Sequence, residues 1–141
     1  MWGCDRVSNG RPQLRPIGTV RSSLTDLGSA PKQASEGAPE AWLEFDSAML
    51  EALDGLEAGD EIVVLTWLDR ADRETLRVHP RGDPANPMQG VFATRSPARP
   101  NPIGLHPCQI AEIDGTRVRV SELEALDGTP VLDVKPVLRG D

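Results

Sequence analysis

The sequence predicts an all-β fold, a mostly antiparallel β-barrel with one short helix. About seven segments have the length and the apolar alternation of β-strands. These segments follow one another too closely for the helical crossovers that parallel strands require, so neighbouring strands should run antiparallel. Closure into a barrel would remove the exposed edges of such a sheet. A length of 141 residues suits one domain.

The first half of the chain contains the clearest alternating segment. In Ala41–Asp46, the side chains of Ala41, Leu43 and Phe45 point to one side and the residues between them to the other, as in a half-buried strand. Three strands are expected in this half of the chain: Ile17–Arg21, Ala41–Asp46 and Glu61–Leu68.

A short helix and a long loop lie between these strands. The hydroxyl of Ser47 can cap a helix over Ala48–Leu53, and Gly55 helps to end it because glycine readily adopts a positive φ. The segment Ser22–Pro39 is rich in Ser, Gly, Pro and Ala, which predicts a loop. Loops of this length in a compact domain are typically functional or disordered.

The second half of the chain holds the remaining strands. Asp114 and Gly115 form a favoured two-residue hairpin turn. Asp133 and Lys135 lie two residues apart on a strand, hence on one face, where they can form an ion pair. Five strands are expected: Thr75–Val78, Gly90–Thr94, Leu105–Ile113, Arg117–Leu123 and Val131–Leu138.

The chain is interpreted as one folded domain over residues 16–141, preceded by a disordered leader over residues 1–15, which show no periodicity. No segment approaches the roughly 20 apolar residues that cross a bilayer, and the N-terminus lacks the apolar core of a secretory signal. The sequence therefore predicts a cytoplasmic protein with no membrane partner. In that compartment, Cys4 and Cys108 need not form a disulfide.

The net charge of −7 argues against loose, charge-driven binding to nucleic acid. The charges are nevertheless segregated along the chain. Residues 34–68 contain nine acidic residues and no Lys or Arg, whereas residues 77–105 contain four arginines and one acidic residue. An acidic protein can still hold an anionic ligand in a local arginine cluster. The alternative is that both segments form solvated faces.

The segment Gly90–Leu105, GVFATRSPARPNPIGL, is the densest candidate for chemistry. Its three prolines fix their own φ and restrict the residue before each of them, so the loop should be stiff. A stiff loop would present Arg95, Arg99 and Asn101 in fixed directions, and two rigidly held arginines suit a carboxylate or phosphate. The alternative is a proline-rich turn with merely exposed arginines.

Three further polar segments are weaker signals by themselves. They are Pro31-Lys32-Gln33 in the long loop, Asp69-Arg70 after a strand, and the turn Asp127-Gly128-Thr129-Pro130. On local chemistry alone, each is better explained as a turn or as solvated polar residues. The histidines and cysteines are too scattered to match the ligand spacing of a zinc site, so no metal is expected.

Taken in order, the motifs of this chain resemble those of the TsaA-like, or TrmO, family. The resemblance runs from about Pro16 to Pro136 and rests on PIGTVRS (16–22), PKQ (31–33), GLE (55–57), VVLTWLD (63–69), HPRG (79–82), GVFATRSPARPNPIGL (90–105) and LDGTPVLDVKP (126–136). It implies a single-sheeted β-barrel and a homodimer. It also implies an S-adenosyl-L-methionine-dependent methyltransferase acting on N6-threonylcarbamoyladenosine beside the anticodon, with the tRNA anticodon stem-loop as partner.

The resemblance also implies which residues bind the cofactor, and these fall in four segments of the chain. They are Pro31, Lys32 and Gln33; Asp69 and Arg70; Arg95 and Leu105; and Glu124, Ala125, Leu126 and Asp127. Many bacterial members carry an additional C-terminal domain beyond the length of this sequence. If that domain helps to hold tRNA, the resemblance implies the cofactor more strongly than it implies the substrate.

Asn101 and Arg99 are the catalytic candidates. Methyl transfer needs an acceptor aligned behind the methyl group, and the lone pair of an exocyclic adenine nitrogen is delocalised into the ring. The side-chain oxygen of Asn101 could accept the N6 hydrogen and so make that nitrogen more nucleophilic. Arg95 and Arg99 could hold the methionyl carboxylate, a tRNA phosphate or the threonylcarbamoyl carboxylate. Two alternatives remain: a methyltransferase of a small molecule, and a non-catalytic module that binds S-adenosyl-L-methionine.

Overall fold

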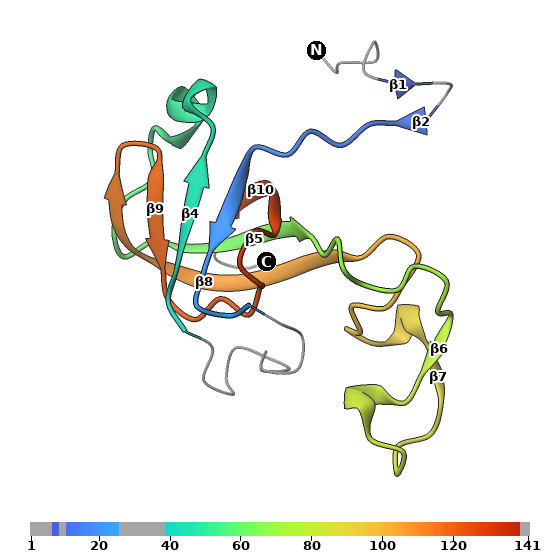
Figure 1. Cartoon of the computed structure of the whole chain (residues 1–141). Helices are drawn as coiled ribbons and strands as arrows, with labels where there is room; N and C mark the ends of the chain where they lie inside the picture. Colours follow the sequence, from blue (N-terminus) through green and yellow to red (C-terminus); the bar gives the residue numbers. More distant parts are fainter. Residues whose placement is uncertain (1–6, 9–10, 26–38, 139–141) are drawn as a thin grey trace.

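The computed structural model describes residues 7–8, 11–25 and 39–138. Six strands pair in the closed order β10-β3-β4-β9-β8-β5, and every neighbouring pair is antiparallel (Figure 1). The mostly antiparallel β architecture predicted from the sequence is therefore confirmed. The six strands are β3 (Gly18–Arg21), β4 (Ala41–Phe45), β5 (Glu61–Trp67), β8 (Ile103–Asp114), β9 (Arg117–Val120) and β10 (Pro130–Pro136).

The core lies inside this ring of strands because apolar residues alternate along them. On β4, Ala41, Leu43 and Phe45 are buried, as their alternation predicts. Facing strands supply branched aliphatic side chains of similar size, which pack into one cluster. Members of this cluster include Val20, Ile62, Val64, Ile110, Val118, Val120 and Val131.

The predicted helix cap and the predicted hairpin turn need correction. The segment after β4 is the 3-10 helix η3 (Ser47–Leu53), which begins at Ser47 itself, so Asp46 and not Ser47 occupies the cap position. Asp46 makes no side-chain capping hydrogen bond, although the helix does end before Gly55, whose φ is +98°. The β8–β9 hairpin closes Asp114 against Arg117, so its turn is Gly115-Thr116, one residue later than predicted.

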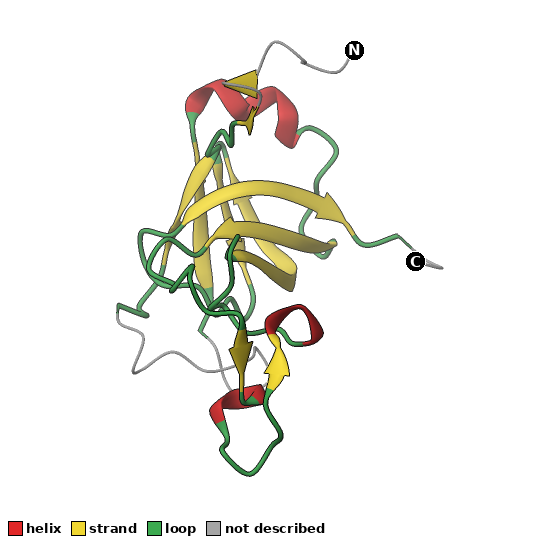
Figure 2. Ribbon diagram, turned by 90° about the vertical axis from the view of Figure 1, so that its right-hand side faces the viewer, coloured by secondary structure: helices red, strands yellow, loops and turns green. Residues whose placement is uncertain are grey.

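Residues 69–102 form an arm that leaves the barrel between β5 and β8 (Figures 1 and 2). The arm contains only two short strands among its described residues, β6 (Arg77–Val78) and β7 (Gln89–Gly90), together with the 3-10 helices η4 (Pro80–Gly82) and η5 (Val91–Ala93). The predicted strand Gly90–Thr94 is therefore wrong beyond its first residue, and Thr75–Val78 is half as long as predicted. Strand β7 ends at Gly90 because the chain turns into η5, where the Thr94 amide donates to the Val91 carbonyl at 3.0 Å.

A separate two-stranded ribbon lies near the N-terminus, where β1 (Val7–Ser8) pairs with β2 (Arg11–Pro12). It lies outside the closed ring of strands, and the domain boundary at residue 16 stays a prediction. Near the C-terminus, Lys135 Nζ lies 3.3 Å from Asp133 Oδ2, which confirms the predicted ion pair. In the part of the chain that the structure describes, no helix is long and apolar enough to cross a membrane.

Candidate functional site

Two of the predicted cofactor segments, Asp69-Arg70 and Glu124–Asp127, lie beside strand ends that meet at one rim of the barrel. Strand β3 ends there, β10 begins beside it, and β5 ends where β8 begins, since Trp67 pairs with Ile103 and Thr66 pairs with Val131. We call the chain around these strand ends (residues 22–25, 67–70, 101–103 and 124–129) the site rim. Tertiary structure thus brings together segments that lie about 100 residues apart in the sequence.

Hydrogen bonds fix the segments of the site rim to one another. The Ser22 amide donates to Asp127 Oδ1 at 3.0 Å, and the Asp127 amide donates to the Leu24 carbonyl at 2.7 Å. Arg70 Nη1 donates to the Thr25 carbonyl at 3.2 Å. Arg70 therefore joins the end of β5 to the beginning of the loop that follows β3. Pro31, Lys32 and Gln33 of that loop lie outside the described residues.

The predicted cofactor residues before and in the Asp127 turn offer the site rim mainly backbone polar groups and buried apolar side chains. Ala125 and Leu126 are buried, so their side chains form an apolar floor, whereas Glu124 and Asp127 are partly buried. The turn at residues 126–129 closes through Thr129 Oγ1, which donates to the Leu126 carbonyl at 2.7 Å. This segment can supply backbone polar groups and carboxylates above an apolar base.

The other predicted cofactor residues differ in how accessible they are. Asp69, Arg70 and Arg95 are exposed, and Arg95 lies in the arm just after η5. Leu105 is 47% exposed, and as the cross-strand partner of Leu65 it lies on the outer face of the barrel. An exposed guanidinium such as that of Arg95 remains able to pair with a carboxylate or phosphate.

Arg99 holds the arm together in this structure. Its guanidinium donates to the carbonyls of Val91 (2.9 Å), Ser96 (3.0 Å) and Thr94 (3.1 Å). Three backbone carbonyls therefore hold the half-buried side chain against its own loop. The catalytic role of Arg99 stays a prediction, and of the two loop arginines Arg95 is the more accessible to a ligand.

Asn101 is exposed in the turn before β8, and its partner is a residue that the sequence analysis did not select. Arg73 Nη2 donates to Asn101 Oδ1 at 3.2 Å, and Arg73 Nε donates to the Pro100 carbonyl at 2.8 Å. The same guanidinium lies 5.0 Å from the centre of the Trp67 ring. No motif singles out Arg73, because its two partners are 27 and 28 residues away in the sequence.

A buried polar pair lies inside the barrel below the site rim. His106 Nε2 and Thr66 Oγ1 are 2.8 Å apart, and both residues are buried. Among the described residues His106 Nδ1 has no hydrogen-bond partner, and burial lowers the pKa of His106 to about 4. A Cβ atom at Gly104 would clash with Thr66 Oγ1 and His106 Nε2. The glycine of the NPIGL motif therefore leaves the room that this pair needs.

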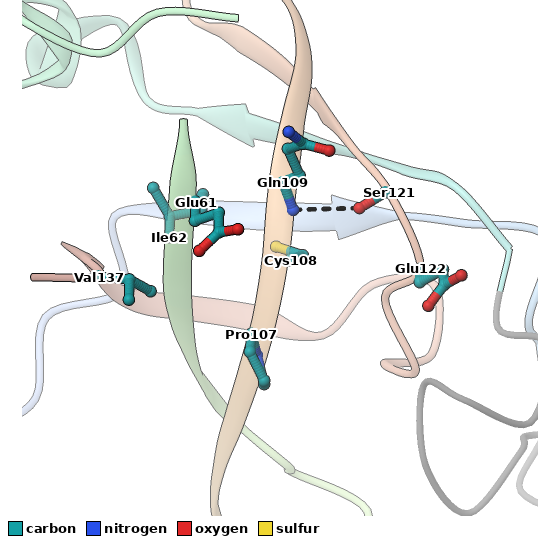
Figure 3. Close-up of a pocket in the computed structure, with 8 residues that line it drawn as sticks. All are labelled: Glu61, Ile62, Pro107, Cys108, Gln109, Ser121, Glu122 and Val137. Carbon is teal, nitrogen blue, oxygen red and sulfur yellow. Dashed lines mark hydrogen bonds between the residues drawn. The ribbon is translucent and has the colours of Figure 1, made fainter. Parts of the chain in front are cut away.

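A shallow pocket of about 330 Å³ lies near the other end of β5, away from Trp67 (Figure 3). On one side of the pocket, the backbone amide of Gln109 donates a hydrogen bond to Ser121 Oγ at 3.0 Å. Burial raises the pKa of the Cys108 thiol in its wall to about 12, so this thiol is protonated at neutral pH and a poor nucleophile. No group of three or more potential metal ligands occurs among the described residues. The pocket is lined by Glu61, Ile62, Pro107, Cys108, Gln109, Ser121, Glu122 and Val137.

The sequence model of the tRNA-methyltransferase O N-terminal domain matches residues 19–140. The chain belongs to this family. It is 45% identical over 130 residues to a Methanothermobacter thermautotrophicus protein named "Probable S-adenosyl-L-methionine-binding protein", and the match covers 92% of this chain and 93% of that protein. An Archaeoglobus fulgidus protein of the same name is 43% identical over 124 residues, covering 88% of this chain and 33% of that protein.

Solved structures of TrmO have the same fold as this chain. The crystal structure of TrmO from Pseudomonas aeruginosa superposes with a TM-score of 0.72 and 32% sequence identity over 89% of this chain. That match covers 55% of the TrmO chain, so the present chain spans about half of its length. The resemblance to the TrmO family that the sequence motifs indicated is confirmed.

Proposed function

We propose that this chain is an S-adenosyl-L-methionine-dependent methyltransferase that methylates N6 of threonylcarbamoyladenosine beside the anticodon of a tRNA. The observation that carries the proposal is the site rim. In a member of the tRNA-methyltransferase O family, it joins the ends of β3 and β5 to the start of β10 by direct hydrogen bonds. A tRNA substrate is consistent with a cytoplasmic enzyme.

The donor and acceptor groups of the site rim suit the proposed cofactor. S-adenosyl-L-methionine combines a carboxylate, cationic ammonium and sulfonium groups, and an adenine ring, and it supplies an electrophilic methyl group. The exposed guanidiniums of Arg70 and Arg95 suit the carboxylate, and the carboxylate of Asp69 suits a cationic group. The buried side chains of Ala125 and Leu126 give an apolar base of the kind on which an adenine ring can lie.

The residues of this chain would act mainly by binding and orientation. The side chains of Arg95 and Asn101 come from a segment that prolines and Arg99 hold rigid, so little conformational entropy is lost when they meet a ligand. Rigid placement of the acceptor behind the methyl group is the main requirement of the transfer. Arg99 contributes by fixing this loop through three carbonyl groups.

We further propose a homodimer in which the arm contributes to a shared site. Three large apolar side chains of the arm are exposed: Phe92 is 82% exposed, Leu76 64% and Met88 43%. Phe92 lies three residues before Arg95 in the segment Gly90–Leu105. A second copy of the chain could cover these side chains and, by two-fold symmetry, bring two arginine-containing segments together.

The first experiment measures cofactor binding by calorimetry in the presence of a chelator. We expect the wild-type chain to bind S-adenosyl-L-methionine and S-adenosylhomocysteine, and absence of binding to both would contradict the methyltransferase proposal. Arg95→Ala should lower cofactor affinity or turnover about tenfold or more, because a hydrogen bond to a charged group contributes roughly 1.5–3 kcal/mol. Arg117→Ala is the matched control, because Arg117 pairs with Glu44 on the outer face of β9.

The second experiment distinguishes a tRNA substrate from a small-molecule substrate. The net charge of −7 favours the small molecule, because it repels the phosphate backbone of tRNA. Mass spectrometry of tRNA nucleosides from cells lacking the gene should show unmethylated threonylcarbamoyladenosine. An unchanged nucleoside profile, with intact cofactor binding, would contradict the tRNA substrate alone. Log affinity for tRNA should fall as log salt concentration rises, with a slope of about one unit for each phosphate contact. A slope near zero would favour the small molecule.

A further inference from the structure

Arg73 connects the end of β5 with the turn before β8 through three separate contacts. Its guanidinium binds the Pro100 carbonyl and Asn101 Oδ1, and it lies over the ring of Trp67, the last residue of β5. A guanidinium is planar and presents its donors in a fixed fork, so contacts along its edge and on its face restrain its orientation together.

The turn that Arg73 contacts, Pro100-Asn101-Pro102, depends on hydrogen-bond donors from other residues. Pro100 and Pro102 have no backbone N–H, so the turn can be fixed mainly through its carbonyl groups. All three of its carbonyls accept hydrogen bonds: that of Pro100 from Arg73, that of Asn101 from the Ile103 amide at 2.7 Å, and that of Pro102 from the Leu68 amide at 2.8 Å. The segment after β5 therefore supplies two of the three donors.

The contact with Arg73 also determines which group Asn101 presents. Oδ1 of Asn101 accepts the hydrogen bond from Arg73, whereas Nδ2 has no hydrogen-bond partner in the described part of the chain. An amide whose oxygen is held in this way offers its NH₂ group, a donor, to a ligand. This differs from the interpretation of the sequence, in which the oxygen of Asn101 accepts the N6 hydrogen of the substrate.

We propose that Arg73 is a positioning residue that makes Asn101 a hydrogen-bond donor for the substrate. The inference rests on the proposed function and adds to it the chemical feature that the site selects. The preferred substrate carries a carbonyl or carboxylate oxygen beside the methyl-accepting nitrogen, and Asn101 Nδ2 donates to that oxygen. An adenosine without such a substituent leaves this donor unpaired, which weakens its binding.

The test compares the binding of two anticodon stem-loop RNAs, one with threonylcarbamoyladenosine and one with plain adenosine. Fluorescence anisotropy in the presence of S-adenosylhomocysteine gives both affinities without turnover. We expect the wild-type chain to prefer the modified RNA by about tenfold or more, as for a hydrogen bond to a charged acceptor. Arg73→Ala and Asn101→Asp should each lose most of this preference, while the cofactor affinity measured by calorimetry stays within about twofold.

Asn101→Asp decides between donor and acceptor. Aspartate has nearly the same shape as asparagine and can still accept from Arg73, but it has no NH₂ group to donate. Retention of the full preference by Asn101→Asp, together with its loss in Asn101→Ala, would show that the oxygen acts as an acceptor and would overturn the proposal. Because Asn101→Asp keeps the shape of the turn, it remains informative if Arg73→Ala does not fold.

A matched control separates the role of Arg73 from the general effect of removing a stacked arginine. Arg117 lies 4.3 Å from the centre of the Trp42 ring and 3.5 Å from Glu44, on the outer face of the β4–β9 pair. Arg117→Ala should keep the wild-type preference. An equal preference in Arg73→Ala and Arg117→Ala would overturn the inference alone. A wild-type chain that binds cofactor but does not methylate the modified RNA would overturn the proposed function and this inference with it.

Discussion

The barrel and the arm are stabilised by different kinds of contact. In the barrel, Val20, Leu43 and Val120 are fully buried in one apolar cluster. In the arm, backbone carbonyls accept hydrogen bonds from side chains: Arg99 binds three of them, and Asn86 Nδ2 donates to the Pro80 carbonyl at 2.8 Å. The barrel therefore depends on packing, whereas the arm depends on local polar contacts.

This difference explains where binding residues can be placed. Polar contacts within the arm fix its shape while its large apolar side chains, such as Phe92, remain on the surface. A segment built in this way can present Arg95 and Asn101 without taking apolar residues from the core. Substitutions in the barrel should therefore change the free energy of unfolding, and substitutions on the surface of the arm should change recognition.

The largest expected effect is that of a cavity in the barrel. Leu43→Ala should lower the free energy of unfolding by about 2–5 kcal/mol, because it removes buried apolar volume that the closed sheet cannot refill. Urea denaturation measures this change. Leu50→Ala is the control, since Leu50 is 57% exposed on η3 and should change stability by less than about 0.5 kcal/mol. Equal losses in the two variants would contradict the assignment of the core.

The next effect is a dependence of barrel stability on pH that comes from His106. Burial lowers its pKa from 6.5 to about 4 in the folded chain, so between these values the unfolded chain binds more protons. The contribution of uncharged His106 to the free energy of unfolding is fully present above about pH 6.5. It is lost as the pH falls towards 4, which lowers that free energy by about 3 kcal/mol. Urea titrations across this range should show a shallower decline for His106→Gln. An identical decline in the two proteins would contradict the burial of an uncharged His106.

The smallest effect on stability, and a clear effect on association, is expected for the arm. Phe92→Ser should leave the free energy of unfolding of the monomer within about 0.5 kcal/mol, because Phe92 is largely exposed. If a second copy covers Phe92, the substitution should weaken dimerisation tenfold or more, since burying a Phe side chain contributes roughly 1.5–3 kcal/mol. Sedimentation equilibrium measures this change. A wild-type chain that is monomeric at micromolar concentration with full activity would contradict the shared site.

The sequence alone predicted most of the barrel because a strand has a short, local period. Ala41–Phe45 alternates with a period of two residues, and the structure buries the predicted side chains. The apolar pattern failed where side-chain hydrogen bonds decide the backbone conformation. Residues 91–93 look like a strand but form η5, where Thr94 Oγ1 and Arg99 both donate to the Val91 carbonyl.

The candidate site was predictable as a set of motifs but not as an arrangement. The sequence placed Asp69 and Arg70 after a strand and Asp127 in a turn. Only barrel closure joins β5 to both β8 and β10 and so brings these segments to one rim. The contact of Arg73 with Asn101 and the pair of Thr66 with His106 span 28 and 40 residues. No local pattern encodes such pairs, because the β5–β8 register brings Thr66 to His106 and the return of the arm to the barrel brings Arg73 to Asn101.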